Sequence, residues 1–215
     1  MGVFLINLLW VKSLTKKTGD FIIIFIRGGN VLKTPLNFQL TDYDCGPVSL
    51  KNDICFLFER NDIPIVIIKK IDRCTMDIKK GGTSKKAVNK YIKWLNNYAK
   101  KNDINIKCER LTGKDVTLNK IKTCINNYGC VLIRCWQGSE HYVIMTNLDN
   151  NNAYIFDPYY LDKTAFNEDS QVQMVFNKCY LYNRLVSIKR IFEESKSDFS
   201  LGKICKRECV LFYRL

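Results

Sequence analysis

The chain has 215 residues, of which 47% are hydrophobic and 12% aromatic, so it is long and apolar enough to build a packed core. Ten cysteines with no CxxC pair, together with a single histidine, argue against a structural zinc site, and no phosphate-binding glycine loop is present. We therefore expect neither a metal nor a cofactor. The net charge of +13 raises the question of a nucleic-acid partner.

The positive charge is concentrated between residues 69 and 101, where eleven Lys or Arg residues stand against two Asp. Such a surface suits nucleic acid, an anionic membrane or an acidic substrate. Lysine and asparagine together fill 45 positions, however, a bias that an AT-rich coding sequence produces without selection for binding, and only nine residues are arginine. We expect a solvated lysine face and no nucleic-acid partner.

The first 30 residues contain two apolar runs, 3–11 and 21–26, both shorter than the roughly 18 residues that a membrane-spanning helix needs. Positive charges follow the first run and no small-residue cleavage site ends it, unlike a signal peptide. We expect an extension over 1–30, packed on the domain as strands or an amphipathic segment, with weak contact to a membrane surface as the alternative. Residues 31–215 should form one domain, and the apolar settings of several cysteines favour a reduced, cytoplasmic protein.

The first predicted helix follows Gly46 and Pro47, which suit a turn and a first helical position, and its apolar run continues over 48–58. The thiol of Cys45 would face the start of this helix. The unpaired amides and the positive end of the helix dipole there lower the pKa of a thiol and make it a nucleophile. A second helix is expected to begin at Ser84 as N-cap, with an apolar stripe at spacings of three and four through residue 98.

The rest of the predicted domain is rich in strands. We expect strands at 105–111, 131–136, 142–148, 154–156 and 208–215, and helices at 118–128, 167–176 and 181–194. Residues 149–152, Asp-Asn-Asn-Asn, form a strong hairpin turn. Helices followed by an antiparallel sheet predict an α+β fold, in which a helix-borne cysteine faces a strand-borne histidine.

Three further residues fit a catalytic role beside Cys45. His141 is the only available histidine base, Asp157 would orient it, and the Gln39 amide with the Cys45 N–H would form an oxyanion hole. Each has an ordinary structural interpretation as well. Cys45 would then be a buried thiol, His141 a core histidine, Asp157 a turn residue before Pro158, and Gln39 a loop residue.

A glutamine, a short loop and Asp-Cys-Gly-Pro at a helix start, as in QLTDYDCGPVSL (39–50), resemble the papain-like cysteine peptidases, above all their peptidase C39-like branch. The order Cys45, His141, Asp157 is that family's order, and Gly-Gly-Thr-Ser at 81–84 is similar to a loop before its second helix. The resemblance covers about 39–160. It implies a papain-like fold, with N-terminal helices and a helix-start nucleophile packed on an antiparallel β-sheet that carries the histidine and the aspartate.

The resemblance also implies a thiol-dependent peptidase that works through an acyl-enzyme intermediate, with Cys45, His141, Asp157 and Gln39 as its catalytic residues. Its substrate would be a peptide or protein, and the branch includes domains that trim leaders at Gly-Gly sites. Two alternatives stay open: an amide-forming acyltransferase with the same triad, and an inactive basic binding module of the same fold.

Overall fold

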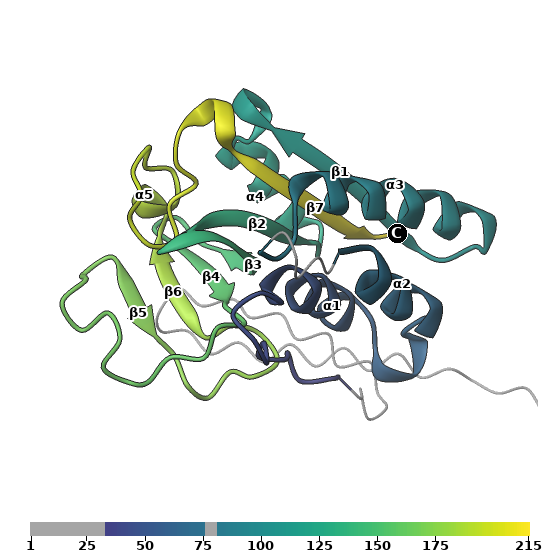
Figure 1. The fold of residues 1–215 in the computed structure, drawn as a ribbon, viewed down its shortest axis with the longest axis horizontal. Helices are drawn as coiled ribbons and strands as arrows, with labels where there is room; N and C mark the ends of the chain where they lie inside the picture. Colours follow the sequence, from purple (N-terminus) through teal and green to yellow (C-terminus); the bar gives the residue numbers. More distant parts are fainter. Residues whose placement is uncertain (1–32, 76–80) are drawn as a thin grey trace, which may run out of the picture. The chain divides into compact units, whose positions relative to one another are not determined.

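A computed structural model describes residues 33–75 and 81–215, which contain seven strands in one antiparallel sheet (Figure 1). The strand order is β1-β7-β2-β3-β4-β6-β5. The strands are β1 (Ile106–Thr112), β2 (Cys130–Gln137), β3 (Ser139–Leu148), β4 (Asn152–Phe156), β5 (Val172–Met174), β6 (Arg184–Ser187) and β7 (Glu208–Arg214). The α-helices are α1 (Cys45–Leu57), α2 (Ile65–Thr75), α3 (Lys85–Lys101), α4 (Leu118–Asn126) and α5 (Ile188–Ile191). The predicted α+β class, with helices packed on an antiparallel sheet, is confirmed.

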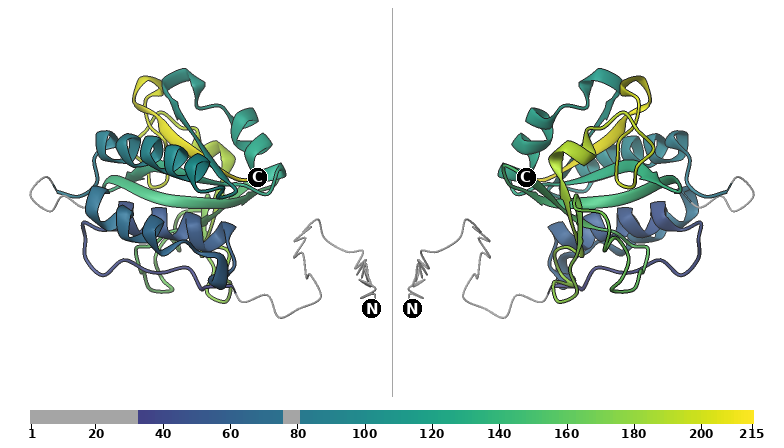
Figure 2. Two further views of the ribbon diagram at one scale, coloured as in Figure 1. Left: turned by 90° about the vertical axis from the view of Figure 1, so that its right-hand side faces the viewer. Right: turned by 90° about the vertical axis from the view of Figure 1, so that its left-hand side faces the viewer.

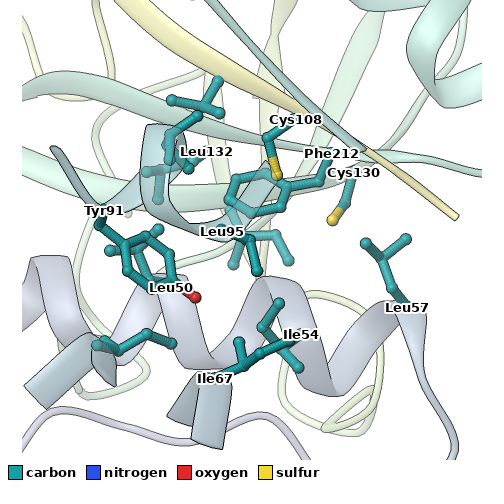
Figure 3. Packing of buried hydrophobic residues seen from close by; sticks show 14 of the residues in the cluster. Leu50, Ile54, Leu57, Ile67, Tyr91, Leu95, Cys108, Cys130, Leu132 and Phe212 are labelled. Atoms are coloured by element: carbon teal, nitrogen blue, oxygen red, sulfur yellow. The ribbon is translucent and has the colours of Figure 1, made fainter. Parts of the chain in front are cut away.

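One hydrophobic core lies between helices α1, α2 and α3 and the sheet. Leu50 and Ile54 of α1 and Leu95 of α3 are fully buried in it, together with Phe212 of β7 (Figure 3). Burying a side chain of this size stabilises the fold by about 1.5–3 kcal/mol. The apolar stripe predicted for the helix after Ser84 is thus the face that fixes α3 to the sheet.

A second core covers the other face of the sheet, because successive strand side chains point to opposite sides. Tyr142 and Ile144 of β3 belong to the first core, whereas Val143 and Met145 belong to the second, with Ile121 of α4. Two turned views show helices on both sides of the strands (Figure 2). The middle strands are therefore held on both faces and give a rigid base for residues at their ends.

Helix α1 is fixed to the sheet and to the preceding segment by polar contacts as well. The buried Ser49 Oγ donates a 2.8 Å hydrogen bond to the carbonyl of Tyr142 in β3. The Asn52 side chain accepts from the Asn37 N–H at 2.8 Å and donates to the Asn37 carbonyl at 3.0 Å. The start of α1 is thereby held at a fixed place along β3.

Several predicted local signals are confirmed. Ser84 caps α3, since its Oγ accepts a hydrogen bond from the Ala87 N–H at 3.1 Å. Asp149 builds the hairpin turn between β3 and β4 by accepting from the N–H groups of Asn151 and Asn152. Side chains that bond nearby backbone groups produce such caps and turns locally, so the sequence predicts them well.

The predictions after residue 160 were wrong in part, and one helix was missed. The expected helices at 167–176 and 181–194 are replaced by strands β5 and β6 and the single turn α5, while α2 was not predicted. Apolar residues at 181–192 fit a helical period, but β6 pairs with β4 from Asn152↔Ser187 to Ile155↔Arg184. Covering the open edge of β4 outweighs local preference here.

The remaining predictions concern the cysteines, the membrane and the domain organisation. Cys130 and Cys135 are buried thiols as predicted, whereas Cys179 and Cys205 are exposed. Within 33–75 and 81–215, no helix combines the length and the apolar character that crossing a bilayer requires. The expected extension over 1–30 lies outside the described residues. The one-domain organisation over 31–215 and the cytoplasmic location stay predictions.

Candidate active site

Four neighbouring strands bring polar side chains to one end of the sheet. Because β2, β3, β4 and β6 are antiparallel neighbours, the end of β2, the start of β3, the residue after β4 and the start of β6 meet there. Those positions hold Gln137, His141, Asp157 and Arg184. Cys45, the first residue of α1, lies at the same place, close enough to His141 for each side chain to shift the pKa of the other.

The turn before Cys45 is built by its neighbour Asp44. The Asp44 carboxylate accepts hydrogen bonds from the N–H groups of Leu40 at 3.1 Å and Thr41 at 3.0 Å, and it makes no side-chain cap on α1. Orphan amides at a helix start favour a negative charge nearby. Since Asp44 does not cap these amides, they favour the thiolate of Cys45.

The glycines around this turn are required by close packing. A Cβ added at Gly46 would lie 2.3 Å from the Thr83 Oγ1 atom, a contact that no real side chain makes. Gly82 has φ +109°, and a Cβ there would lie 3.0 Å from the Tyr43 carbonyl oxygen. The Gly-Gly-Thr-Ser loop therefore packs directly against the turn that presents Cys45.

The environment of Cys45 and His141 shifts both pKa values toward an ion pair. Burial raises the pKa of the Cys45 thiol, but the hydrogen bond and charge of His141, with backbone hydrogen bonds at Tyr142 and Gly46, lower it below its ordinary value overall. Burial lowers the pKa of His141, yet hydrogen bonds to Asp157 and Cys45 raise it to about 9. Both shifts favour a thiolate beside an imidazolium over the neutral pair.

Asp157 is fully buried and its carboxylate is surrounded by donors. Its Oδ1 lies 2.8 Å from His141 Nε2 and accepts from the Tyr159 N–H at 2.9 Å. Its Oδ2 accepts from Gln137 Nε2 at 3.1 Å and lies 3.6 Å from the Arg184 guanidinium. Because Asp157 occupies Nε2, the other ring nitrogen of His141 is the one available to Cys45.

A second set of bonds fixes the backbone of Asp157. The Asn183 side chain accepts from the Asp157 N–H at 2.7 Å and donates to the Asp157 carbonyl at 2.7 Å. The buried Arg184 donates to the carbonyls of Asn183 and Tyr159. Asn183 and the start of strand β6 thus fix the position of Asp157, and a fixed Asp157 restricts the orientation of the His141 imidazole.

Gln39 lies beside the site, with its amide turned to its own loop. Its backbone N–H donates to the Pro158 carbonyl at 2.8 Å, which joins the loop before Cys45 to the residue after Asp157. Its side-chain Nε2 donates to the Thr41 carbonyl at 2.8 Å. The oxyanion role of Gln39 therefore stays a prediction.

Sequence reasoning missed Gln137, Asn183 and Arg184. Gln137 could have been found from the tight turn at Gly138, because a hairpin there pairs β2 with β3 and brings Gln137 close to His141. Asn183 and Arg184 lay inside the wrongly predicted helix at 181–194, where an arginine is expected to face solvent. Their role follows only from the pairing of β6 with β4.

A thiol, an imidazole and a buried carboxylate are thus placed in series, an arrangement able to activate a thiol for attack on a carbonyl. Among the described residues, no group of three or more His, Cys, Asp or Glu side chains is placed to hold a metal ion. Comparison with models of known protein families gave no match, and a search of curated proteins gave no significant match either.

Proposed function

We propose that this chain is a papain-like, C39-like cysteine peptidase that cleaves peptide amide bonds through Cys45, His141 and Asp157. The observation that carries the proposal is the placement of Cys45, at the start of α1, within electrostatic range of His141, which is itself hydrogen-bonded to the buried Asp157. A histidine with a purely structural role would not need a nearby thiol with a lowered pKa, and such shifted pKa values gather at functional sites.

In the proposed reaction, the Cys45 sulfur attacks the carbonyl carbon and the C=O electron pair moves to oxygen. The backbone N–H of Cys45 and the Gln39 amide, turned away from Thr41, stabilise this oxyanion. His141 gives its proton to the leaving amine as the C–N bond breaks, which leaves a thioester on Cys45. Water then attacks the thioester with His141 as base, releasing a carboxylic acid and restoring the thiolate–imidazolium pair.

Selective alkylation tests the nucleophile. Iodoacetamide at pH 6.5 is expected to modify Cys45 well before the other thiols, because only a thiolate reacts fast. Two cysteines serve as internal controls: Cys135, whose pKa is raised by burial and by nearby Asp157 and Cys45, and the exposed Cys205. Peptide mapping in which Cys45 reacts no faster than Cys205 would leave the inactive binding module as the better interpretation.

Product analysis tests the reaction type. Short peptides are incubated with the protein, with and without an excess of free amine, and the products are identified by mass spectrometry. We expect free carboxylate whether or not amine is added, and no turnover by the Cys45→Ser variant. Transfer of the acyl group almost wholly to the amine would assign the chain as an acyltransferase instead, since both routes share the thioester.

A further inference from the structure

A group of basic side chains lies around Tyr142 and Glu208 and is not used by the proposed mechanism. We call Lys85 of α3, Arg110 of β1 and Arg134 of β2 the basic cluster. The cluster surrounds the buried Glu208, whose carboxylate lies 2.7 Å from Arg110 Nε and 4.0 Å from Lys85 Nζ. A single buried carboxylate therefore faces two of these three cations.

Tyr142 links the basic cluster to the nucleophile. Its backbone hydrogen-bonds to the Cys45 sulfur, and it is the direct cross-strand partner of Arg134. Burial raises the pKa of the Tyr142 phenol, and the charges of Glu208 and Cys45 raise it further, whereas Arg134 lowers it. The phenol is thus within electrostatic range of both the thiol and the cluster.

The cluster carries more positive charge than its surroundings compensate. Burial lowers the pKa of Lys85, and so do Arg134, Arg110 and Lys206, against the opposing effect of Glu208. Lys85 also stands in the first turn of the 17-residue α3, where the helix dipole disfavours a cation. The Lys85 ammonium donates one hydrogen bond to the Lys206 carbonyl, and an ammonium group has further N–H donors with which it could bind an anion.

Two buried polar atoms beside the basic cluster have no hydrogen-bond partner within 33–75 and 81–215. They are the Tyr142 hydroxyl and the Glu208 Oε2, on side chains that are 3% and 1% exposed. An unpaired buried hydroxyl costs free energy unless something satisfies it. A hydroxyl donor among cations is suited to accept an anionic group as its partner.

Arg134 is paired with a carboxylate that a ligand could replace. Its guanidinium makes an ion pair with Glu140, the residue before His141, and the Glu140 side chain is 57% exposed. The Arg134 side chain is only 12% exposed and needs an anionic partner, whereas Glu140 lies at the surface, so another carboxylate could replace Glu140 and leave Arg134 paired. Arginine binds carboxylates through two parallel hydrogen bonds, which gives direction as well as attraction.

We propose that Arg134, Lys85 and the Tyr142 hydroxyl form a substrate subsite for a carboxylate close to the scissile bond. This inference rests on the proposed function and extends it: the preferred substrate carries an acidic side chain near the cleaved bond or a free terminal carboxylate. Glu140 occupies Arg134 while the subsite is empty and moves aside when the substrate carboxylate binds.

Two alkylating agents of nearly equal size test the subsite without a known substrate. Iodoacetate carries a carboxylate and iodoacetamide does not, so the ratio of their rates at Cys45 reports attraction of an anion. We expect this ratio to be about tenfold higher at Cys45 than at Cys205. It should fall about threefold in Arg134→Met and in Lys85→Met, and it should fall as salt is added.

Lys101→Met is the matched control, because it removes the same charge from the far, exposed end of α3 and should leave the ratio unchanged. An imidazolium on His141 attracts iodoacetate in every variant, so a high ratio that none of the substitutions lowers would overturn the subsite. If iodoacetamide still alkylates Cys45 rapidly in that case, the proposed nucleophile stands although the subsite does not. Failure of the subsite is thus distinguished from failure of the proposed function.

Protection of Cys45 from iodoacetamide by bound peptides then shows which kind of substrate carboxylate the subsite prefers. Three peptides of equal length are compared: one with an internal Asp and an amidated end, one with Asn in its place, and one with Asn and a free C-terminus. Stronger protection by the Asp peptide assigns a side-chain carboxylate, and stronger protection by the free C-terminus assigns a terminal one. Equal protection by all three would contradict a carboxylate subsite.

Discussion

Two aspartates within residues 33–75 and 81–215 are completely buried, yet their surroundings differ. Asp157 is contacted by His141, Gln137, a backbone N–H and the Arg184 guanidinium. Asp53 of α1 has only the Cys130 thiol at 3.5 Å on one oxygen, and its other oxygen has no hydrogen-bond partner among the described residues. Burial raises the pKa of Asp53 well above its usual value.

The comparison shows what distinguishes a site from a core. In the core around Asp53, burial removes water and supplies no charged donor, so the neutral carboxyl is favoured. At Asp157, the ends of four strands provide charge-assisted hydrogen bonds in place of the lost water. A buried polar residue with converging donors is a better indication of function than burial alone.

The largest expected difference between the two aspartates is in activity. Asp157→Asn should lower kcat/KM at least about a hundredfold while leaving a folded, measurable enzyme, because the imidazole loses the group that orients it. Asp53→Asn makes the same chemical change outside the site and should keep kcat/KM within twofold. Equal losses in both variants, or unfolding of Asp157→Asn, would indicate that Asp157 is a structural turn residue.

Removal of Arg184 should give the largest change in stability. Its side chain is 2% exposed and faces Asp157, and deleting one partner of a buried pair typically costs about 3–5 kcal/mol. Arg184→Met keeps the length of the side chain but not its charge. Urea unfolding should show this loss, whereas Lys120→Met, which breaks an exposed pair with Asp115, should cost less than about 1 kcal/mol.

The pH dependence of kcat/KM should report the same arrangement. The pKa of His141 is raised to about 9, so the proton needed by the leaving amine is present below that pH and lost above it. The stability that His141 contributes has the same sign: it is complete below about pH 6.5 and lost as pH rises through about 9.

Asp157→Asn provides the check on this assignment. Removing the carboxylate should move the alkaline limb of the pH profile down by about one to two units, because Asp157 is among the groups that raise the pKa of His141. Asp53→Asn should leave the limb where it is. An alkaline limb that stays near pH 9 in Asp157→Asn would mean that another group titrates there.

The sequence predicted those parts of the fold that depend on neighbouring residues. The Ser84 cap and the Asp149 turn are local, and each was placed correctly. The first helix was also predicted, but it begins at Cys45, two residues before the predicted first helical position at Pro47. The pairing of β6 with β4 is not local. The periodicity of residues 181–192 suits a helix equally well, so only the finished sheet shows that this segment is a strand.

The residues of the candidate site also differ in whether the sequence alone could identify them. Cys45, His141 and Asp157 stand out because their residue types suit the chemistry, and the structure brings all three together. Gln137 and Arg184 act on Asp157 from strands 20 and 27 residues away along the chain. Their side chains have no distinctive sequence pattern, so contacts between adjacent strands are needed to find them.

The smallest expected effect concerns Asp53 itself. Because burial raises its pKa, the folded state keeps a proton that the unfolded state, with an aspartate pKa near 3.9, has already released. Folding stability from this group therefore falls as pH rises above about 4.

Asp53→Asn has nearly the same shape and no charge, so it should stabilise the protein by about 1–2 kcal/mol at pH 7, with the gain shrinking toward pH 4. Urea unfolding at both pH values measures this, and the exposed Asp62→Asn is the control. A gain that does not depend on pH would contradict a titrating Asp53.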